Sequence, residues 1–188
     1  PEVRVQMQVT NRVIDLVEEG VDVALRVRTT LEDSGSLVVK PLGQTRTVLV
    51  CAPSLIARLG RPAGIQDLGR MDTVSMSAVD GRSSWSIRGP GGETHTLVHH
   101  PRYVADDLMT LKSAVLEGVG IGLVPDYLCS ESLGNGRLVE VLPGWGPPSG
   151  LVHAVFPSRR GMIPAVRAFI DYLGENVKGE QMTFGTGA

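Results

Sequence analysis

The pattern of apolar and polar residues predicts a chain of short strands and helices in alternation. Residues 3–9 alternate apolar and polar side chains, a period of two that predicts a strand with one buried face. Thr10 or Asn11 then fits a helix N-cap, residues 13–17 carry a helical apolar stripe, and residues 21–27 form a second, largely apolar strand. A strand, a short helix and an apolar strand make a βαβ unit, so we expect these two strands to be parallel.

The same alternation continues along the rest of the chain. Further strands are expected at residues 37–39, 47–52, 73–76, 85–87, 94–99, 121–124, 138–142 and 151–156, with the glycine-rich turn 89–92 making a hairpin. Further helices are expected after Pro53 and up to Gly60, at 65–68, at 108–117 behind a cap at Asp106 or Asp107, at 127–133, and from Pro164 onward.

Composition narrows the class of protein. The 188 residues are 42% hydrophobic but only 4% aromatic, and 23 are glycine, which favours an α/β domain with an aliphatic core. Cys51 and Cys129 have apolar neighbours and are expected to be buried free thiols, which favours the cytoplasm. A formal charge of −2 argues against nucleic-acid binding by this chain alone. No apolar run approaches the roughly 20 residues of a membrane span.

Catalytic and metal-binding signatures are missing from the sequence. His99 and His100 are neighbours on an expected strand and point to opposite faces, so they cannot chelate one metal ion. The chain has no H-E-x-x-H, C-x-x-C or G-x-S-x-G pattern. Gly118, Gly120 and Gly122 lack the spacing of a nucleotide-binding loop and indicate close packing instead. We therefore expect no enzymatic activity, no cofactor and no metal.

Six segments carry a further signal, because they occur together and in a fixed order. They are DLVEEGVDVALR at 15–26, VLVCAPSL at 48–55, GRP with DL at 60–62 and 67–68, EGVGIGLVP at 117–125, GRLV with VLP at 136–139 and 141–143, and VRAFIDYL at 166–173. The six segments resemble motifs that occur in the same order in the effector-binding (substrate-binding) domain of LysR-type bacterial transcriptional regulators.

The resemblance implies a type II periplasmic-binding-protein-like α/β fold, with two α/β lobes joined by two crossover strands and a ligand cleft between them. Lobe I would comprise residues 1–49 and 152–175, lobe II residues 50–151, and the polar tail 176–188 is expected to be disordered. The chain opens with Pro1 rather than Met. We therefore expect a fragment or a processed product, and the resemblance implies that a winged helix-turn-helix, a linker helix and the first strand and helix of the effector domain lie upstream.

Candidate effector-binding residues come from a rule for parallel sheets. Ligands bind beyond the carboxyl ends of the strands, where helix N-termini present free N–H groups. This rule selects four places: Thr10 and Asn11; Arg26 and Val27; Met76 and Ser77; and Asp106 and Asp107 together with Val124 and Pro125.

Each place also has a purely structural explanation. Thr10 and Asn11 fit a helix cap, and Ser77 fits an ordinary loop. Arg26 fits either a bidentate carboxylate contact or an ion pair elsewhere. Asp107 fits a helix cap that also complements the helix dipole. The family often has Asn-Asp where this chain has Asp106-Asp107, which puts the polar contact there in question.

The resulting hypothesis is an effector-sensing regulatory domain that binds a small molecule, expected to be a carboxylate. It would form a homodimer or homotetramer in the cytoplasm, without membrane contact, and reach DNA only through the upstream domain. The alternatives are a periplasmic solute-binding protein of a transporter with the same fold and an enzyme on this fold. The upstream sequence distinguishes the first two, because a regulator needs a helix-turn-helix and a transport protein needs a secretory signal.

Overall fold

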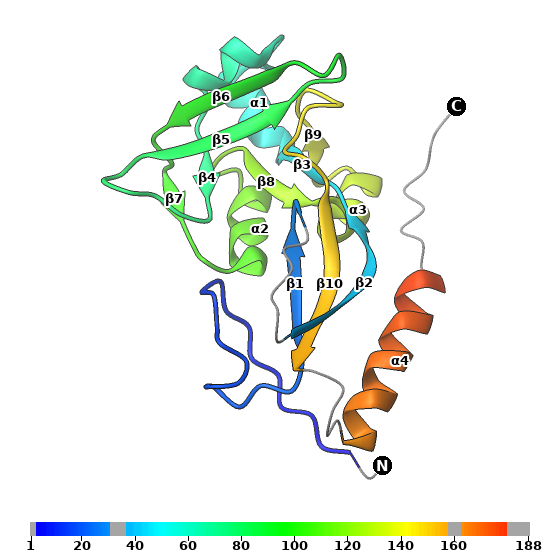
Figure 1. Ribbon diagram of the computed structural model, residues 1–188. Helices are drawn as coiled ribbons and strands as arrows, with labels where there is room; N and C mark the ends of the chain where they lie inside the picture. Colours follow the sequence, from blue (N-terminus) through cyan, green and yellow to red (C-terminus); the bar gives the residue numbers. More distant parts are fainter. Residues whose placement is uncertain (1–2, 31–36, 158–162, 180–188) are drawn as a thin grey trace. The chain divides into compact units, whose positions relative to one another are not determined.

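The computed structural model describes residues 3–30, 37–157 and 163–179 of the chain (Figure 1). Residue contacts divide it into two compact units. The first unit is Pro1–Thr45 together with Ser149–Ala188, and the second is Arg46–Pro148. The chain therefore passes from one unit to the other twice, at residues 45–46 and 148–149. Strands and helices alternate within an α/β architecture, as the sequence predicts.

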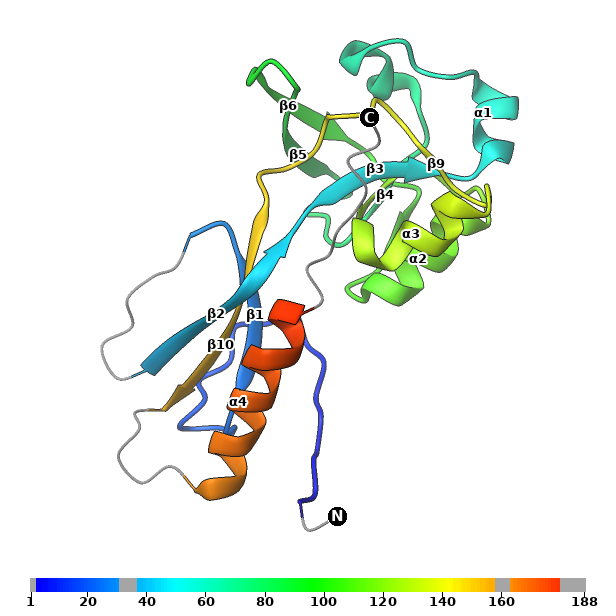
Figure 2. The ribbon, with the colours of Figure 1, turned by 90° about the vertical axis from the view of Figure 1, so that its right-hand side faces the viewer.

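The first unit is built on a three-stranded antiparallel sheet. Its order is β1 (Ala24–Arg28), β10 (Gly150–Pro157), β2 (Leu37–Thr45), so β10 is central. The helix α4 (Pro164–Gly179) runs beside β2 and β10 (Figure 2). Ile170 of α4 is buried in a cluster with Leu42, Ala154 and Phe156 of the sheet. The helix continues to Gly179, past the expected start of the tail at 176, and residues 180–188 lie outside the described residues.

The N-terminal stretch of this unit differs from the prediction. Residues 3–9 form no strand, and a hydrogen-bonded turn over 16–20 replaces the expected helix. The expected parallel pairing is also wrong, because β1 pairs with β10 and does so antiparallel. The physical reason is that a strand needs a neighbour for its backbone groups, and no described residue pairs with 3–9. Their apolar side chains are consequently exposed.

The second unit holds most of the regular structure. Strand β3 (Thr47–Cys51) lies between β8 (Gly122–Pro125) and β9 (Val139–Glu140) and is antiparallel to both. The other elements are the parallel pair β4 (Val74–Ser75) and β7 (Tyr103–Val104), the hairpin β5 (Ser83–Arg88) and β6 (Thr94–His99), and the helices α1 (Pro53–Leu59), η1 (Ile65–Arg70), α2 (Leu108–Leu116) and α3 (Asp126–Gly134).

Local signals explain where these helices begin and end. Pro53 opens α1, where its missing N–H costs no hydrogen bond, and Gly60 ends it with φ 81°. The side chain of Asp107 caps α2 by accepting a hydrogen bond from the backbone of Thr110. The predicted starts of α1 and α2 are therefore confirmed.

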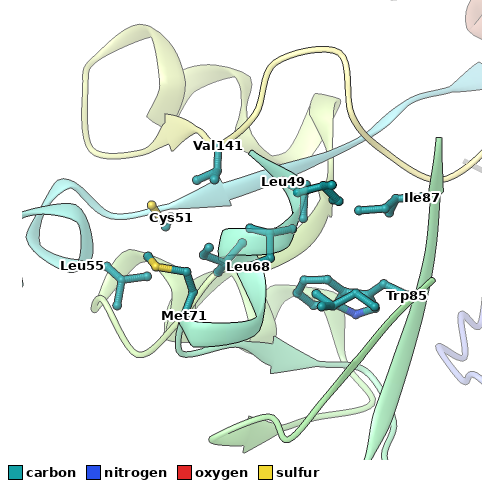
Figure 3. Packing of buried hydrophobic residues seen from close by; sticks show 11 residues of the cluster. Leu49, Cys51, Leu55, Leu68, Met71, Trp85, Ile87 and Val141 are labelled. Carbon is teal, nitrogen blue, oxygen red and sulfur yellow. The ribbon is translucent and has the colours of Figure 1, made fainter. Parts of the chain in front are cut away.

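Two apolar clusters make the core of the second unit. The first cluster brings Leu49 and Cys51 of β3 against Leu55, Leu68, Trp85 and Ile87 (Figure 3). The second lies around Val48, Val50, Val74, Leu111 and Val115. Gly120 allows the close approach expected from the sequence, because a Cβ there would lie 2.7 Å from the backbone of Thr73.

Candidate functional site

Three strand ends converge on one edge of the second unit. Strands β4 and β7 are parallel, with Ser75 opposite Val104. Thr73 also bridges Ile121 in the parallel sense, just ahead of β8. The carboxyl ends of β4, β7 and β8 therefore point to the same edge, where the backbone N–H of Ala105 donates to the carbonyl of Ser75 at 3.2 Å. We call it the strand-exit edge, and its residues are Met76, Ser77, Asp106, Asp107, Val124 and Pro125.

Met76 and Ser77 leave β4 at the strand-exit edge. Met76 is half-buried and packs against the second apolar cluster, whereas Ser77 is exposed. Just before them, the buried Ser75 hydroxyl lies 2.7 Å from the hydroxyl of Ser83. Ser77 thus presents an exposed hydroxyl on a segment whose start is held in place.

The two aspartates at this edge have different roles. Asp107 Oδ1 accepts hydrogen bonds from the backbone N–H and the hydroxyl of Thr110, each at 2.7 Å. These bonds lower the pKa of the Asp107 carboxyl. The structural explanation therefore holds for Asp107, and its carboxylate occupies the helix N-terminus that would otherwise attract an anion. Asp106 is exposed beside it.

Val124 and Pro125 supply packing at this edge rather than polar side chains. Val124 is fully buried opposite Val48 of β3. Pro125 is buried at the start of α3, and its carbonyl accepts the thiol of Cys129 at 3.4 Å. Only the backbone of this pair has polar groups to offer a ligand.

The four predicted residues of the first unit do not lie where the parallel-strand rule assumed. Thr10 and Asn11 follow no strand, and both are exposed. Arg26 and Val27 lie in β1, whose partner β10 is antiparallel. The guanidinium of Arg26 donates to the carbonyl of Ile14 at 3.0 Å, so part of its donor capacity holds the N-terminal turn. The topological argument for these positions was wrong, because it depended on a βαβ unit that is not formed.

The structure reveals a buried polar group that the sequence did not predict. Thr73 Oγ1 lies 2.6 Å from His99 Nδ1, and the ring of His99 packs on Trp85 with centroids 4.2 Å apart. Burial, together with the nearby His100, lowers the pKa of His99. The sequence signal was weak: Thr73 and Ser75 alternate on one strand, as do Ser83 and Trp85 on another. Which of these side chains meet is decided by tertiary structure.

Neither cysteine is poised for reaction. Cys51 and Cys129 are free and buried, as predicted, and burial raises the pKa of each thiol to about 11. A thiol with so high a pKa is a poor nucleophile near neutral pH. Within residues 3–30, 37–157 and 163–179, no group of three or more potential metal ligands occurs. No helix in the same ranges is long and apolar enough to cross a bilayer.

Comparison with known proteins gives a consistent set of matches. A family model described as the LysR substrate binding domain matches residues 1–178. A probable HTH-type transcriptional regulator LtrA of Klebsiella pneumoniae is 32% identical over 94% of the chain, and the chain covers 57% of it. The HTH-type transcriptional regulator PtxR of Pseudomonas aeruginosa is also 32% identical over 94% of the chain, with 56% of its length covered. The chain thus spans little more than half of these relatives.

Solved structures agree with the sequence matches. The full-length virulence activator AphB of Vibrio cholerae, a member of the LTTR family, superposes with a TM-score of 0.80 over 94% of this chain and 59% of its own, at 25% identity. The regulatory domain of AphB from Vibrio vulnificus gives 0.71 at 28% identity, covering 85% of this chain and 77% of its own. The fold is therefore the type II periplasmic-binding-protein-like α/β fold of such regulatory domains.

Proposed function

This chain belongs to the LysR substrate binding domain family, and we propose that it senses a small-molecule effector on behalf of a bacterial transcription factor. The structural observation that carries the proposal is the strand-exit edge of the second unit. Three parallel strand ends meet there, and an exposed serine, Ser77, follows the first of them. Small ligands of open α/β sheets bind in this position.

In the second unit we assign effector contact to Met76 and Ser77. The Ser77 hydroxyl can donate to or accept from a polar group, while Met76 adds an adaptable apolar surface. Asp106 and Asp107 disfavour an anionic group next to α2, since like charges repel. The part of the effector near α2 is therefore neutral or cationic.

In the first unit Arg26 is the proposed partner for a carboxylate. A guanidinium has five N–H donors in a fixed fork, and one nitrogen of Arg26 is used on Ile14. The remaining donors suffice for a bidentate contact. We accordingly propose a small carboxylate or an amino acid as the effector, and we keep Thr10, Asn11 and Val27 as further candidate contacts.

The whole protein is proposed to act as its relatives' names indicate. Its curated relatives are HTH-type transcriptional regulators, so we propose that a winged helix-turn-helix outside this chain binds the DNA. We further propose a cytoplasmic homodimer or homotetramer without enzymatic activity, in which effector binding changes how subunits pack. The same relatives favour this function over solute binding for a transporter.

Thermal melting of this chain against small carboxylates and amino acids tests the proposal. A ligand that binds only the folded state adds about 2.7 kcal/mol of stability at a hundredfold excess over its dissociation constant. We expect a stabilising compound whose effect is lost in Ser77→Ala or Arg26→Ala. Ser86→Ala is the matched control, because Ser86 is also an exposed serine but lies on the hairpin. A shift that survives both site substitutions would refute the assigned residues, and a panel without any hit would count against an effector of this class.

A further inference from the structure

Two polar contacts join strand β4 and the residue before it, Thr73, to the hairpin β5–β6 inside the second unit. They are Thr73 Oγ1 to His99 Nδ1 at 2.6 Å and Ser75 Oγ to Ser83 Oγ at 2.7 Å. Thr73 and Ser75 lie two residues apart, on the same side of their strand, and Ser83 is directly opposite His99 in the hairpin. The contacts are therefore consecutive rungs between the same two elements. We call these two contacts the polar tie.

His99 is the ionisable member of the polar tie. It is 6% exposed, and its Nε2 has no hydrogen-bond partner within the described part of the chain. In the neutral ring this leaves one N–H or one lone pair unsatisfied. In the protonated ring both nitrogens are donors, so a charged N–H would be buried without an acceptor. The Trp85 ring, at 4.2 Å, offsets only part of that cost.

Among the described residues no carboxylate is hydrogen-bonded to the His99 ring, and the two aspartates nearest to it along β4 and η1 already have partners of their own. Asp72, next to Thr73, is already bound by two arginines at 2.8 and 3.0 Å. Asp67 on η1, which packs on β6, is bound by a backbone N–H at 2.8 Å and by an arginine. His100 opposes a second positive charge. The other titratable or charged groups on, beside or against these elements are Arg58, Arg70, Asp80, Arg82, Arg88, Glu93, His95, Arg102, Tyr103, Asp106, Asp107, Lys112 and Glu117.

We propose that His99 is a proton-operated switch on the polar tie. The neutral ring holds the hairpin against β4, and uptake of a proton drives the ring out of its buried position and releases the hairpin. Because β4 leads directly into Met76 and Ser77, release also loosens the strand-exit edge. Control of effector binding by this step rests on the proposed function, whereas the switch itself does not.

The direction of the pH effect follows from linkage. The pKa of His99 is lower in the folded chain than in the unfolded chain, so the unfolded chain takes up the proton first. The stability from neutral His99 is complete above the ordinary histidine pKa of about 6.5. It declines as the pH falls below that value and levels off only below the folded-state pKa.

Melting between pH 5 and pH 8, followed by tryptophan fluorescence, tests the switch. Both tryptophans, Trp85 and Trp145, lie in the second unit, so the signal reports on that unit. We expect the melting temperature of the unmodified chain to fall below about pH 6.5, and this acid branch to flatten in His99→Gln. His100→Gln is the matched control, since His100 is exposed, and should keep the branch. An acid branch that is unchanged in His99→Gln overturns the proposal.

Two measurements on the unmodified chain do not depend on a folded variant. The ring signals of His99 in an NMR titration should report a pKa below about 6.5, and a value at or above this overturns the switch. Amide exchange at Met76 and Ser77, corrected for intrinsic rates, should be faster at pH 5.5 than at pH 7.5. Equal rates would refute the loosening of the edge. The effector panel at pH 8 tests the proposed function separately, because His99 is neutral there.

Discussion

The N-terminal stretch of the first unit and the core of the second unit carry equally clear apolar patterns, but only one of them is buried. Val3, Val5, Met7 and Val9 are between 57% and 82% exposed, whereas Leu49 and Leu68 are fully buried. An apolar pattern specifies which face of a segment gains by burial. Whether that face is buried depends on a partner surface. In the second unit, other segments of the same unit supply that surface.

The largest change in stability is expected when a core leucine is shortened to alanine. We expect Leu49→Ala to lower the free energy of unfolding of the second unit by about 2–5 kcal/mol, because it leaves a cavity in a closed cluster. The matched control Val5→Ala should change stability by less than about 0.5 kcal/mol, since Val5 is 72% exposed. Urea unfolding followed by tryptophan fluorescence and far-UV circular dichroism measures both. A comparable loss in Val5→Ala would mean that residues 3–9 are packed after all.

A smaller effect is expected from filling the space between strands. A methyl group at Gly120 would meet the Thr73 backbone at 2.7 Å, so Gly120→Ala should destabilise the second unit by about 1–3 kcal/mol. Gly134, at the end of α3, has open space around its Cβ position. Gly134→Ala should therefore be neutral or gain up to about 1 kcal/mol. Equal losses in the two variants would contradict the assignment of the Gly120 cost to close packing against Thr73.

Local chemistry explains which parts of the fold the sequence predicted. The start of α1 at Pro53, its end at Gly60 and the cap at Asp107 depend on neighbouring residues only, and all three are confirmed. The strand at 3–9 depends on a partner that its own residues cannot supply, and that prediction was wrong.

The candidate site likewise has a part that the sequence predicted and contacts that it did not predict. The strand-exit edge followed from a general rule for parallel strands, and the second unit has such strands. The contact of Thr73 with His99 joins residues 26 positions apart, which no local pattern indicates. The bond from Arg26 to the carbonyl of Ile14 likewise depends on how the N-terminal turn folds back.

The smallest expected changes in stability come from charged groups, and they compare an ion pair in the second unit with one in the first. In the second unit, burial raises the pKa of Asp72, but the hydrogen bonds from Arg58 and Arg102 outweigh it and lower that pKa below 3.8. The stability from this carboxylate is therefore present above pH 3.8 and is lost as the pH falls through the lower folded-state value. We expect Asp72→Asn to cost about 1 kcal/mol at pH 7 and to flatten the stability curve below pH 4.

In the first unit, Glu19 accepts hydrogen bonds from Arg12 in the turn that replaces the predicted helix. These bonds also lower the pKa of Glu19, but its charge lies in solvent, where Coulomb attraction is screened. Glu19→Gln should leave the unfolding midpoint unchanged at low and at high salt, measured by circular dichroism. A salt-sensitive loss as large as that of Asp72→Asn would show that the N-terminal turn unfolds together with the rest of the chain. The N-terminal stretch would then contribute to stability although its apolar side chains are exposed.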